Sequence, residues 1–456
     1  MKRAALSGFP ELLPEQRVVE QLVIDDLRRT FELHGFASIQ TRAVEPLTEL
    51  TRKGEIDKEI YVLRRLQANP EPAAPPNLDP IAGLDPSTLG LHFDLTVPFA
   101  RYVLENAGKL NFPFRRYQIQ TVWRGERPQE GRYREFTQAD IDVVGRDTLS
   151  FHHDVEVARV MAEALCQLSF LPPLRLQVNN RKLIEGFYLG VGASDVPAVM
   201  RAIDKLDKLP AAAVAALLED QAGLSPEQAA RCLALAGIRS TDTSFIEQVA
   251  ALGVEHELLS EGLAELAAVM QGCAPLAGER FSVHADLSIA RGLDYYTGTV
   301  FETRMAGHES LGSVCSGGRY DSLATDGSTS YPGVGISLGL TRLLVPLLAR
   351  GQLVGSRSVP SAVLVALAGE DSRADAELVA RALRSRGIAA EVAPSAEKFG
   401  TQIRHAARRG IPFVWFTATE AAGHEVKDIR SGEQVRADPG LWSPPELDRT
   451  PRIMAN

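Results

Sequence analysis

The sequence is poor in the residues that cross-link secreted domains or build transition-metal centres. It has four cysteines, none of them in a Cys-x-x-Cys pair, and its nine histidines include no His-Glu-x-x-His motif. These absences argue against a disulfide framework, a cysteine zinc site and a zinc metalloenzyme. We therefore expect a protein of a reducing compartment, with no metal ion held by its side chains alone.

Long apolar segments are also missing. No run of 18 apolar residues occurs, and the first residues, MKRAALSGFPELLPEQ, lack the apolar region of a secretory signal. A transmembrane helix needs about 20 predominantly apolar residues, and a signal peptide needs a shorter apolar core. We expect a cytoplasmic protein that does not interact with a membrane.

Charge and length set wider limits. Lys and Arg total 49 against 58 Asp and Glu, which gives a formal net charge of −9 over 456 residues. One hydrophobic core rarely serves more than about 250–300 residues, so we expect two or three domains. An acidic total does not exclude an RNA partner, because binding depends on local basic surface.

The stretch Phe114–Gly145 carries the strongest pattern. Alternating residues in YQIQTVW, and again from Phe136 onward, predict two strands joined by the arginine-rich loop RGERPQEGRYR. Guanidinium groups present planar donors that match phosphate oxygens, so this hairpin suits a nucleotide or a nucleic acid. On charge alone, a solvated surface hairpin is the commoner interpretation. The loop arginines are Arg124, Arg127, Arg132 and Arg134.

This stretch has a predicted strand, an Arg-x-Glu triplet, a basic loop, a phenylalanine and a second predicted strand, in that order. The order resembles motif 2 of the class II aminoacyl-tRNA synthetases, and the amino-acid sequence is similar to that of the histidyl-tRNA synthetases. In that family this arginine, Arg124 here, contacts the ATP α-phosphate. The family's phenylalanine, Phe136 here, lies against the adenine. The resemblance also implies that Glu126 accepts a hydrogen bond from ATP or tRNA, and that Gln129 and Arg132 contact tRNA.

Two segments nearer the N terminus extend the resemblance. Residues Glu15–His34 predict an amphipathic helix that ends at Gly35, and GFASIQTRAVEPL predicts a strand after it. This order resembles class II motif 1, which forms the dimer interface in that family, so we expect a homodimer. The usual proline of that strand is Arg42 here, and the usual basic residue near the N terminus is Ser7.

The segment after the proline-rich stretch 69–87, which predicts a loop, is DLTVPFARY. It lies where a strand is expected to run into a helix. Asp94 and Thr96 could receive the ammonium group of a ligand there, although Asp94 could instead cap the helix. DLTVPFARY resembles the amino-acid-binding segment of the histidyl-tRNA synthetases.

The middle of the chain is alanine-rich and predicts helices from about Asp195 to Gln271. Within it, SPEQ fits a capping box with Ser225 at the N-cap and Gln228 at N3. The composition indicates no chemistry. Because this unit lies between two strand-bearing segments, it resembles the insertion domain of the same family.

Two further motifs follow. By composition, Tyr295 and Tyr296 are more typical of a buried structural pair, but RGLDYYTGTVFE resembles the histidine-specific signature of the family. GSVCSGGRYDSL also matches the family and contains Tyr320. YPGVGISLGLTRLLVPLL predicts a glycine-rich strand and then a helix, and it resembles class II motif 3. The arginine of that motif, Arg342 here, contacts the ATP γ-phosphate in the family.

The C-terminal part changes in pattern. Short apolar strands alternate with helices after residue 361 and predict a small α/β domain with a largely parallel sheet. KFGTQIRHAARRGIPFVWF resembles the anticodon-binding domain of the family. The last residues, DPGLWSPPELDRTPRIMAN, predict a tail. The expected basic face consists of Lys398, Arg404, His405, Arg408 and Arg409.

The resemblance covers nearly the whole chain and implies an α/β (α+β) architecture. We expect a class II antiparallel-sheet catalytic domain in two parts, a helical insertion, a linker and a C-terminal α/β anticodon-binding domain. The expected bounds are 1–180 and 276–350 for the catalytic domain, 181–275 for the insertion, 351–360 for the linker and 361–456 for the last domain.

The implied activity joins L-histidine to tRNA(His) in two steps through ATP, with Mg²⁺ bound to the ATP phosphates and no tightly bound prosthetic group. Both reactants of the first step are anions, so fixed positive charge is needed, and Arg124, Arg291 and Arg342 are the expected catalytic residues. The expected histidine contacts are Asp94, Thr96, Arg124, Gln138, Asp142, Arg291, Tyr295, Tyr296 and Tyr320. The expected tRNA contacts of the C-terminal domain are Lys398, Arg404 and Arg408.

Two other functions are possible on this scaffold. A catalytically silent histidine sensor, similar to the regulatory subunit of ATP phosphoribosyltransferase, typically lacks the arginines and the C-terminal domain. A non-enzymatic RNA-binding module would need neither DYYTG nor the glycines of the third motif. The presence of all these features favours the ligase.

Overall fold

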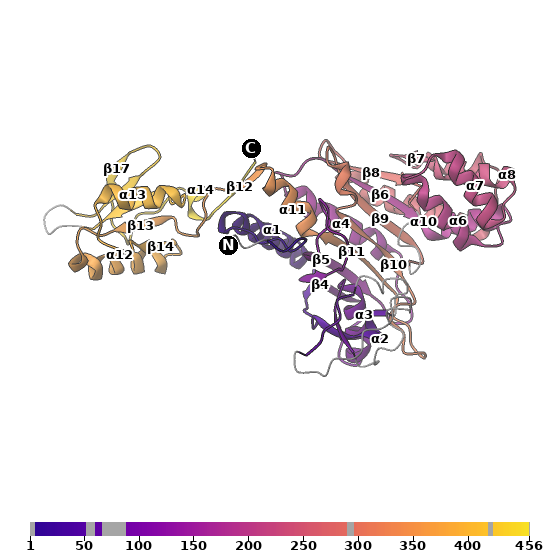
Figure 1. The fold of residues 1–456 in the computed structure, drawn as a ribbon, viewed down its shortest axis with the longest axis horizontal. Coiled ribbons are helices and arrows are strands. Elements are labelled where there is room, and N and C mark those ends of the chain that lie inside the picture. The colour runs from indigo at the N-terminus through magenta and orange to yellow at the C-terminus, as the bar shows by residue number, and fades with distance from the viewer. Residues whose placement is uncertain (1–4, 52–59, 66–87, 290–295, 418–422, 456) are drawn as a thin grey trace. The chain divides into compact units, whose positions relative to one another are not determined.

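The computed structural model describes residues 5–51, 60–65, 88–289, 296–417 and 423–455 (Figure 1). The predicted loop 69–87 lies outside these ranges, as do Arg291 and Tyr295. Two compact units are present. One comprises Met1–Pro10 with Asp26–Pro346, and the other comprises Glu11–Asp25 with Leu347–Asn456.

The first unit is built on a nine-stranded sheet in the order β1-β4-β5-β11-β10-β9-β6-β8-β7. From β4 to β6 every neighbouring pair is antiparallel, whereas β1 with β4 and β6 with β8 are parallel. The predicted antiparallel catalytic sheet is confirmed. The strands are β1 Ala37–Ser38, β4 Phe114–Trp123, β5 Glu135–Val144, β6 Leu174–Asn180, β7 Arg239–Ser240, β8 Phe281–Asp286, β9 Thr299–Met305, β10 Cys315–Tyr320 and β11 Gly333–Gly339.

The N-terminal helix α1 covers Pro14–Leu33, close to the predicted range. The strand predicted after it is broken into β1 and β2 (Val44–Pro46). Between β1 and β2, hydrogen bonds from side chains of β4 take the place of the backbone hydrogen bonds of a strand. Gln118 Nε2 donates to Thr41 Oγ1 at 3.0 Å, and Gln120 Nε2 donates to the Thr41 carbonyl at 3.0 Å. The backbone groups of this stretch therefore find partners without a continuous strand.

Further elements of this unit surround the sheet. Strand β2 pairs antiparallel with β3 (Leu89–Leu91), and α3 begins five residues later at Thr96. Helix α11 follows β11 directly, as the third motif predicts. The helices are α2 Leu47–Leu50, α3 Thr96–Asn106, α4 His152–Gln167 and α11 Leu340–Ala349, and the chain also has short 3-10 helices at Asp204–Asp207, Ala274–Leu276, Glu309–Leu311 and Glu370–Ser372.

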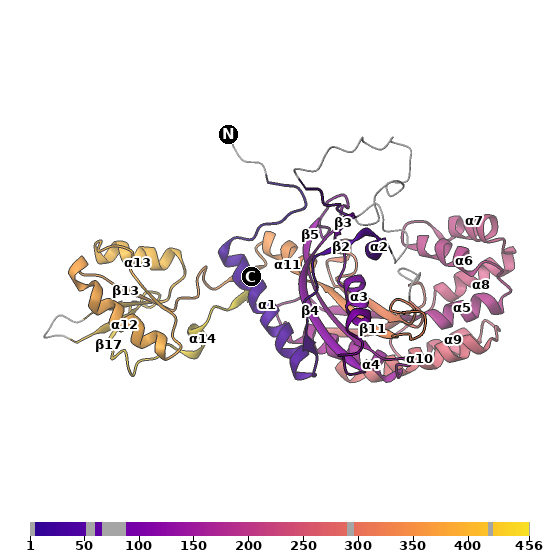
Figure 2. The same ribbon diagram turned by 90° about the horizontal axis from the view of Figure 1, so that it is seen from below.

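The predicted insertion is mostly helical, and α6, α7 and α8 gather beyond β7 and β8 (Figure 1); Figure 2 shows the same helices grouped together. The predicted capping box is present at Ser225 and Gln228. The segment is not wholly helical, however, because β7 joins the central sheet beside β8. The last helix of the insertion, α10, packs closely against α4 of the catalytic domain. The two helices are so close at Gly272 that a Cβ added there would lie 2.2 Å from Val155 of α4. The helices are α5 Arg181–Gly190, α6 Val196–Ile203, α7 Ala211–Ala222, α8 Pro226–Ala236, α9 Phe245–Ala250 and α10 Glu257–Cys273.

The second unit contains a five-stranded sheet in the order β14-β13-β15-β16-β17. The expectation of a largely parallel sheet is wrong, because β13 is parallel to β14 and β15 but β15–β16 and β16–β17 are antiparallel. A parallel neighbour needs a crossover of about a dozen residues or more, and residues 417–424 are too few. The elements are β13 Val363–Ala366, α12 Arg373–Ser385, β14 Ala390–Val392, α13 Phe399–Arg408, β15 Phe413–Phe416, β16 Glu425–Asp428 and β17 Gln434–Arg436.

The C-terminal residues are ordered into this unit, so the predicted tail is wrong. Trp442 packs edge-on against the buried Trp415, with ring centroids 5.6 Å apart. After the short helix α14 (Glu446–Arg449), β18 (Ile453–Ala455) pairs with β12 (Leu353–Gly355) inside the predicted linker. The buried Arg357 donates to the carbonyl oxygens of Asp448 and Arg449. Apolar and backbone contacts therefore join both ends of this unit.

Within the described ranges, no helix combines the length and the apolar content that a membrane span requires.

Candidate active site

Two adjoining pockets open over the central sheet of the first unit. The first, of about 520 Å³, is the arginine pocket. The second, of about 470 Å³, is the carboxylate pocket. Both are lined by Arg124, Gln138, Ser316 and Ser337. The arginine pocket is also lined by Glu126, Gly131, Arg132, Tyr133, Phe136, Ser313, Val314, Gly339 and Arg342. The carboxylate pocket is also lined by Asp94, Thr96, Asp140, Asp142, Tyr296, Gly317, Gly318, Tyr320, Gly335 and Ile336.

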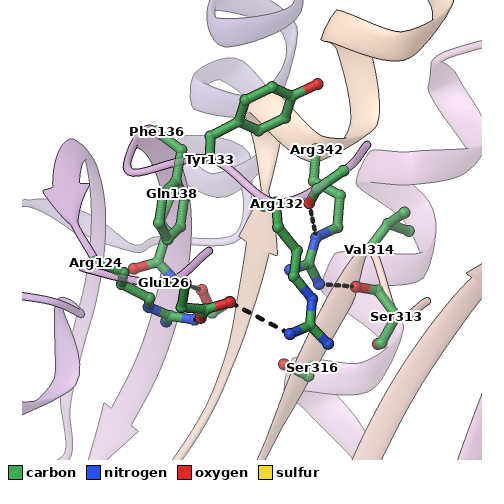
Figure 3. A pocket seen from close by; sticks show the side chains of 13 residues that line it. Arg124, Glu126, Arg132, Tyr133, Phe136, Gln138, Ser313, Val314, Ser316 and Arg342 are labelled. Atoms are coloured by element: carbon green, nitrogen blue, oxygen red, sulfur yellow. Dashed lines mark hydrogen bonds and ion pairs between the residues drawn. The ribbon is translucent and has the colours of Figure 1, made fainter. Parts of the chain in front are cut away.

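Arg124 lies where the two pockets meet, directly after β4. Its backbone N–H donates to the Arg134 carbonyl at 2.9 Å, so the hairpin geometry fixes its position. Its Nε donates to the Phe93 carbonyl at 2.9 Å, and its guanidinium lies 5.1 Å from the ring centroid of Phe136 (Figure 3). Its Nη1 lies 3.8 Å from Glu126 Oε1, and the plane of the guanidinium is held by the aromatic ring.

Arg342 reaches the same pocket from the first turn of α11. Its Nε donates to the Gly131 carbonyl at 2.6 Å and its Nη1 to the Ser313 carbonyl at 2.7 Å (Figure 3). Burial, together with the positive charges of Arg124 and Arg132, lowers the pKa of Arg342. The guanidinium stays charged because its pKa ordinarily lies far above neutrality, so the three positive charges repel one another unless an anion is bound.

The charge balance of the arginine pocket favours an anion. Among the described residues, three guanidinium groups line it, and the lining carboxylate is Glu126. Glu126 lies 3.4 Å from Arg132 and 3.8 Å from Arg124, so it neutralises only part of this charge. A pocket with such an excess suits a polyphosphate.

A magnesium ion here would take most of its ligands from such a polyphosphate and from water. Mg²⁺ prefers oxygen ligands in an octahedral arrangement and is usually held by one or two carboxylates with substrate phosphates. Glu126 is the carboxylate available on this side. In the described part of the chain, the group of three side chains spaced to hold a metal is His152, His153 and Glu156, which lines neither pocket.

Asp142, in the floor of the carboxylate pocket, belongs to a buried ion pair whose other member, Arg116, does not line the pocket. Arg116 of β4 is fully buried, and its Nη2 lies 2.6 Å from Asp142 Oδ2 on β5. Tyr320 donates its hydroxyl to Asp142 Oδ1 at 2.7 Å. Glycine is required opposite this carboxylate, because a Cβ at Gly335 would lie 2.0 Å from Oδ1. Likewise, a Cβ at Gly318 would lie 2.8 Å from the ring of Tyr296.

The carboxylate pocket also offers hydrogen-bond acceptors from Asp94 and Gln138. Asp94 Oδ1 accepts from the Val97 N–H at 3.0 Å, so the capping role considered for Asp94 is real and the residue also lines the pocket. Gln138 donates through Nε2 to Ser337 Oγ at 2.8 Å. Its Oε1 is buried and has no partner among the described residues. Acceptors of this kind suit an ammonium group.

Sequence reasoning missed Arg116 and Asp140. Asp140 is buried between Gln138 and Asp142 on the same face of β5, and it lines the carboxylate pocket. Burial raises its pKa to about 7, with Asp142 and Asp94 adding to the effect and Arg116 opposing it. A signal was present in the sequence, because charged residues at alternate positions of a strand share a face.

Comparison with known proteins agrees with this geometry. A family model described as histidyl-tRNA synthetase matches residues 83–343, and one described as an anticodon binding domain matches residues 362–439. The histidine–tRNA ligase of Micrococcus luteus is 61% identical over 455 residues, which cover 99% of this chain and 98% of that relative. The chain belongs to the histidyl-tRNA synthetase family. The histidine–tRNA ligase of Cutibacterium acnes is also 61% identical, with 98% of each chain covered.

Solved structures support the family fold. The crystal structure of histidyl-tRNA synthetase from Nostoc sp. PCC 7120 matches with a TM-score of 0.81 and 34% identity, covering 95% of this chain and 96% of that chain. A Bacillus halodurans structure titled as an ATP phosphoribosyltransferase regulatory subunit/histidyl-tRNA synthetase has a TM-score of 0.70 at 21% identity, which shows a common fold alone. The family membership supports the ligase over the histidine sensor.

The structure of this histidyl-tRNA synthetase family member brings most predicted site residues together. Gln129 instead lies at the tip of the hairpin, bridged to Arg132. Arg291 and Tyr295 fall outside the described residues, so their predicted roles stay predictions. The arginine pocket unites Arg124, Glu126, Arg132, Phe136, Gln138 and Arg342. The carboxylate pocket unites Asp94, Thr96, Arg124, Gln138, Asp142, Tyr296 and Tyr320.

Proposed function

We propose that this chain is a histidine–tRNA ligase. It activates histidine with ATP to histidyl-adenylate and pyrophosphate, and then transfers histidine to the 3′ end of tRNA(His). One observation carries the assignment: a pocket with excess guanidinium charge adjoins a pocket of buried carboxylates, and the two meet at Arg124. Amino-acid activation needs this adjacency, because a carboxylate must attack an α-phosphate although both are anions.

The proposed ATP contacts follow from the arginine pocket. Arg124 holds the α-phosphate together with the histidine carboxylate, and Phe136 lies against the adenine. Arg342 neutralises the γ-phosphate, and Glu126 accepts a hydrogen bond from the ligand. Two sets of contacts support these roles, because they fix both guanidinium groups before ATP binds. Arg124 contacts the Phe136 ring, and Arg342 donates hydrogen bonds to backbone carbonyls. Arg291 is proposed beside Arg124 from the sequence alone.

Mg²⁺ is proposed to enter with ATP and would be held mainly by the ATP phosphates. When bound, it would supply neutralisation of the phosphate charge. On the protein side, the guanidinium groups of Arg124 and Arg342 stabilise charge on the phosphates, and Glu126 is the carboxylate within this pocket that could meet the ion through water.

Histidine is proposed to occupy the carboxylate pocket. Asp94, Thr96 and Gln138 receive its ammonium group, and Asp142 and Tyr296 contact its ring. The hydrogen bond from Tyr320 orients Asp142. Support comes from the buried, unpartnered Gln138 Oε1, which the described residues leave available to a donor. Tyr295 is proposed as a further contact on the strength of the resemblance.

For tRNA, we propose that Gln129 and Arg132 on the exposed hairpin contact the acceptor end. Lys398, Arg404 and Arg408 of the second unit contact the anticodon; all three are exposed on or beside α13. Arg409 is less available, because it forms an ion pair with Glu391. We keep the proposed division into a split catalytic domain (1–180 and 276–350), an insertion (181–275) and a C-terminal domain (361–456), and we propose a cytoplasmic location.

The decisive test is histidine-dependent ATP–pyrophosphate exchange with the full-length protein, followed by aminoacylation of tRNA(His). Exchange that appears with histidine and with none of the other amino acids supports the assignment. Tight histidine binding without exchange would instead favour the histidine-sensing alternative, and neither binding nor exchange would refute both.

We expect the protein to be a homodimer in solution. Support comes from the likeness of α1 and β1 to class II motif 1. Leu33 at the end of α1 is 75% exposed, and β1 is an edge strand of the nine-stranded sheet. Light scattering at micromolar concentration should give twice the mass of one chain. A mass of one chain, unchanged at tenfold higher concentration, would remove this expectation.

The substitution Asp142→Asn should weaken histidine binding more than ATP binding. The carboxylate that accepts from a ring N–H becomes a neutral amide, and charge-assisted hydrogen bonds contribute about 1.5–3 kcal/mol. Equilibrium titration with each substrate separately gives the two affinities. Arg116 loses its counter-ion in this variant, which should lower the stability of the protein. Both titrations are therefore done below the measured unfolding temperature of the variant. Equal losses for histidine and ATP would place Asp142 outside the histidine pocket.

A further inference from the structure

Asp140 is a buried carboxyl group in the floor of the carboxylate pocket. It lies in the middle of β5, in register with Gln118 of β4 and Ser337 of β11, and it is 2% exposed. The neighbouring Ser337 hydroxyl partly offsets the effect of burial on its pKa. Its Oδ1 has no hydrogen-bond partner in the part of the chain that the structure describes. Buried acceptors are nearly always paired in folded proteins, so this atom is available to a ligand's donor or for its own proton.

The two carboxyl groups of the floor differ in their surroundings. Asp142 has an ion pair with Arg116 and a hydrogen bond from Tyr320. Asp140 has no ion pair of its own within 4 Å among the described residues. Its burial raises its pKa to about 7, so near neutrality it holds a proton about half the time. The ionisable groups around it are Arg116 from β4, Asp142 from β5, Asp94 before α3, Cys315 and Tyr320 from β10, and Arg124 and Tyr296 at the rim.

We propose that Asp140 is a specificity-determining residue that shares one proton with the imidazole ring of bound histidine. The proposal rests on the proposed function, because it takes histidine as the occupant of the carboxylate pocket.

The proton balance is simple. Neutral imidazole has one N–H donor and one bare nitrogen acceptor. Ionised Asp142 accepts from the N–H, and protonated Asp140 donates its O–H to the bare nitrogen. If the proton crosses this hydrogen bond, the result is an imidazolium ring between two carboxylates, with the same number of protons. A side chain without a basic ring nitrogen leaves Asp140 unpaired, so the pair selects for imidazole.

A dependence of binding on pH follows. Above pH 7, free histidine has a neutral ring and Asp140, with a pKa of about 7, is mostly ionised. The complex still needs its shared proton, so binding takes up one proton and weakens as the pH rises. Below about pH 6, both the ring, with an ordinary pKa of about 6.5, and Asp140 are protonated, so binding releases one proton. The affinity for histidine is therefore highest in a narrow window near neutrality.

Isothermal titration of the full-length protein with histidine, without ATP, tests this. At pH 8, titrations in HEPES and in Tris give the number of protons taken up, because the two buffers differ in ionisation enthalpy. We expect the unsubstituted protein to take up about one proton per histidine and to lose affinity on the order of tenfold between pH 7 and pH 8.5. The substitution Asp140→Asn should remove both effects, because an amide N–H can donate to the bare nitrogen at any pH.

Asp142→Asn is the matched control, since it keeps Asp140. It should bind histidine more weakly and still take up the proton at pH 8. The amino group of histidine contributes equally to the proton uptake of every variant. Differences in proton uptake between variants therefore report on the carboxyl group of Asp140. A purely structural role for Asp140 would change thermal stability without changing the proton count.

The outcomes are distinguishable. If the unsubstituted protein neither binds histidine nor exchanges pyrophosphate, the proposed function fails. If it binds histidine without proton uptake at pH 8, or if Asp140→Asn takes up the proton as before, the role of Asp140 is overturned and the proposed function stands. If Asp140→Asn does not fold, Asp140→Ser replaces it, with the same expected loss of uptake.

Discussion

Replacing Arg124 with alanine is expected to slow adenylate formation by about 10²–10³-fold, the usual effect of removing one preorganised donor from developing charge. Arg124 lies where the two pockets meet, and Phe136 and the Phe93 carbonyl hold its guanidinium in place. It is therefore positioned before either substrate binds, and no reorganisation is needed during attack. Its side chain is 27% exposed and lines the pocket, so the melting temperature should change little.

Arg132→Ala is the matched control for this experiment. Arg132 carries the same charge into the same pocket, but its side chain is 53% exposed and its ion pair with Glu126 spans 3.4 Å. Mobile, solvated guanidinium groups stabilise charge weakly, so adenylate formation should fall by less than about tenfold. Single-turnover formation of adenylate at saturating ATP and histidine measures both variants. Equal rates for Arg124→Ala and Arg132→Ala would contradict a special role for Arg124.

Replacing Arg116 with leucine is expected to lower the free energy of unfolding by about 3–5 kcal/mol, because removal of one partner leaves a buried charge uncompensated. Arg116 is fully buried, lies 2.6 Å from Asp142 and has its guanidinium 4.3 Å from the Phe99 ring centroid. Without it, Asp142 either stays ionised with no counter-ion or takes up a proton. Histidine binding should therefore weaken together with stability.

The double variant Arg116→Leu/Asp142→Asn separates these two effects. Replacing both partners of a buried pair is often neutral or stabilising, so much of the stability lost in the single variant should return. Histidine affinity should not return, because the carboxylate proposed to meet the ring is absent. Urea unfolding and histidine titration of both variants provide the measurement. A double variant no more stable than Arg116→Leu alone would show that Arg116 stabilises the fold through Phe99 and not through Asp142.

Local sequence patterns were sufficient for the elements that carry the site. The alternation around the arginine loop predicted the β4–β5 hairpin, and the glycine-rich segment before Arg342 predicted β11 followed by α11. The capping box at Ser225 was also predicted correctly. These features depend on side-chain periodicity and backbone propensity, which are properties of neighbouring residues and can be read without knowledge of distant ones.

Only the tertiary structure revealed the floor of the carboxylate pocket. Arg116 lies in β4 and Asp142 in β5, and their pairing depends on the register of a hairpin with a long loop. Asp140 could be placed on the same face as Asp142 by alternation, but its raised pKa results from burial in the middle of the sheet, where β5 pairs with β11. Strand order and depth of burial are set by long-range contacts, so no local pattern predicts them.

Which residues belong to the second unit was also evident only from the structure. The sequence predicted a loose linker and tail, but β12 pairs with β18 about 100 residues later in the chain, and Glu11–Asp25 groups with this unit although it lies at the other end of the sequence. The sequence by itself determined the motifs, the helices and the chemistry that they imply. The tertiary structure decided which distant strands pair and which charges are buried together, because those outcomes depend on packing between segments that are far apart in the chain.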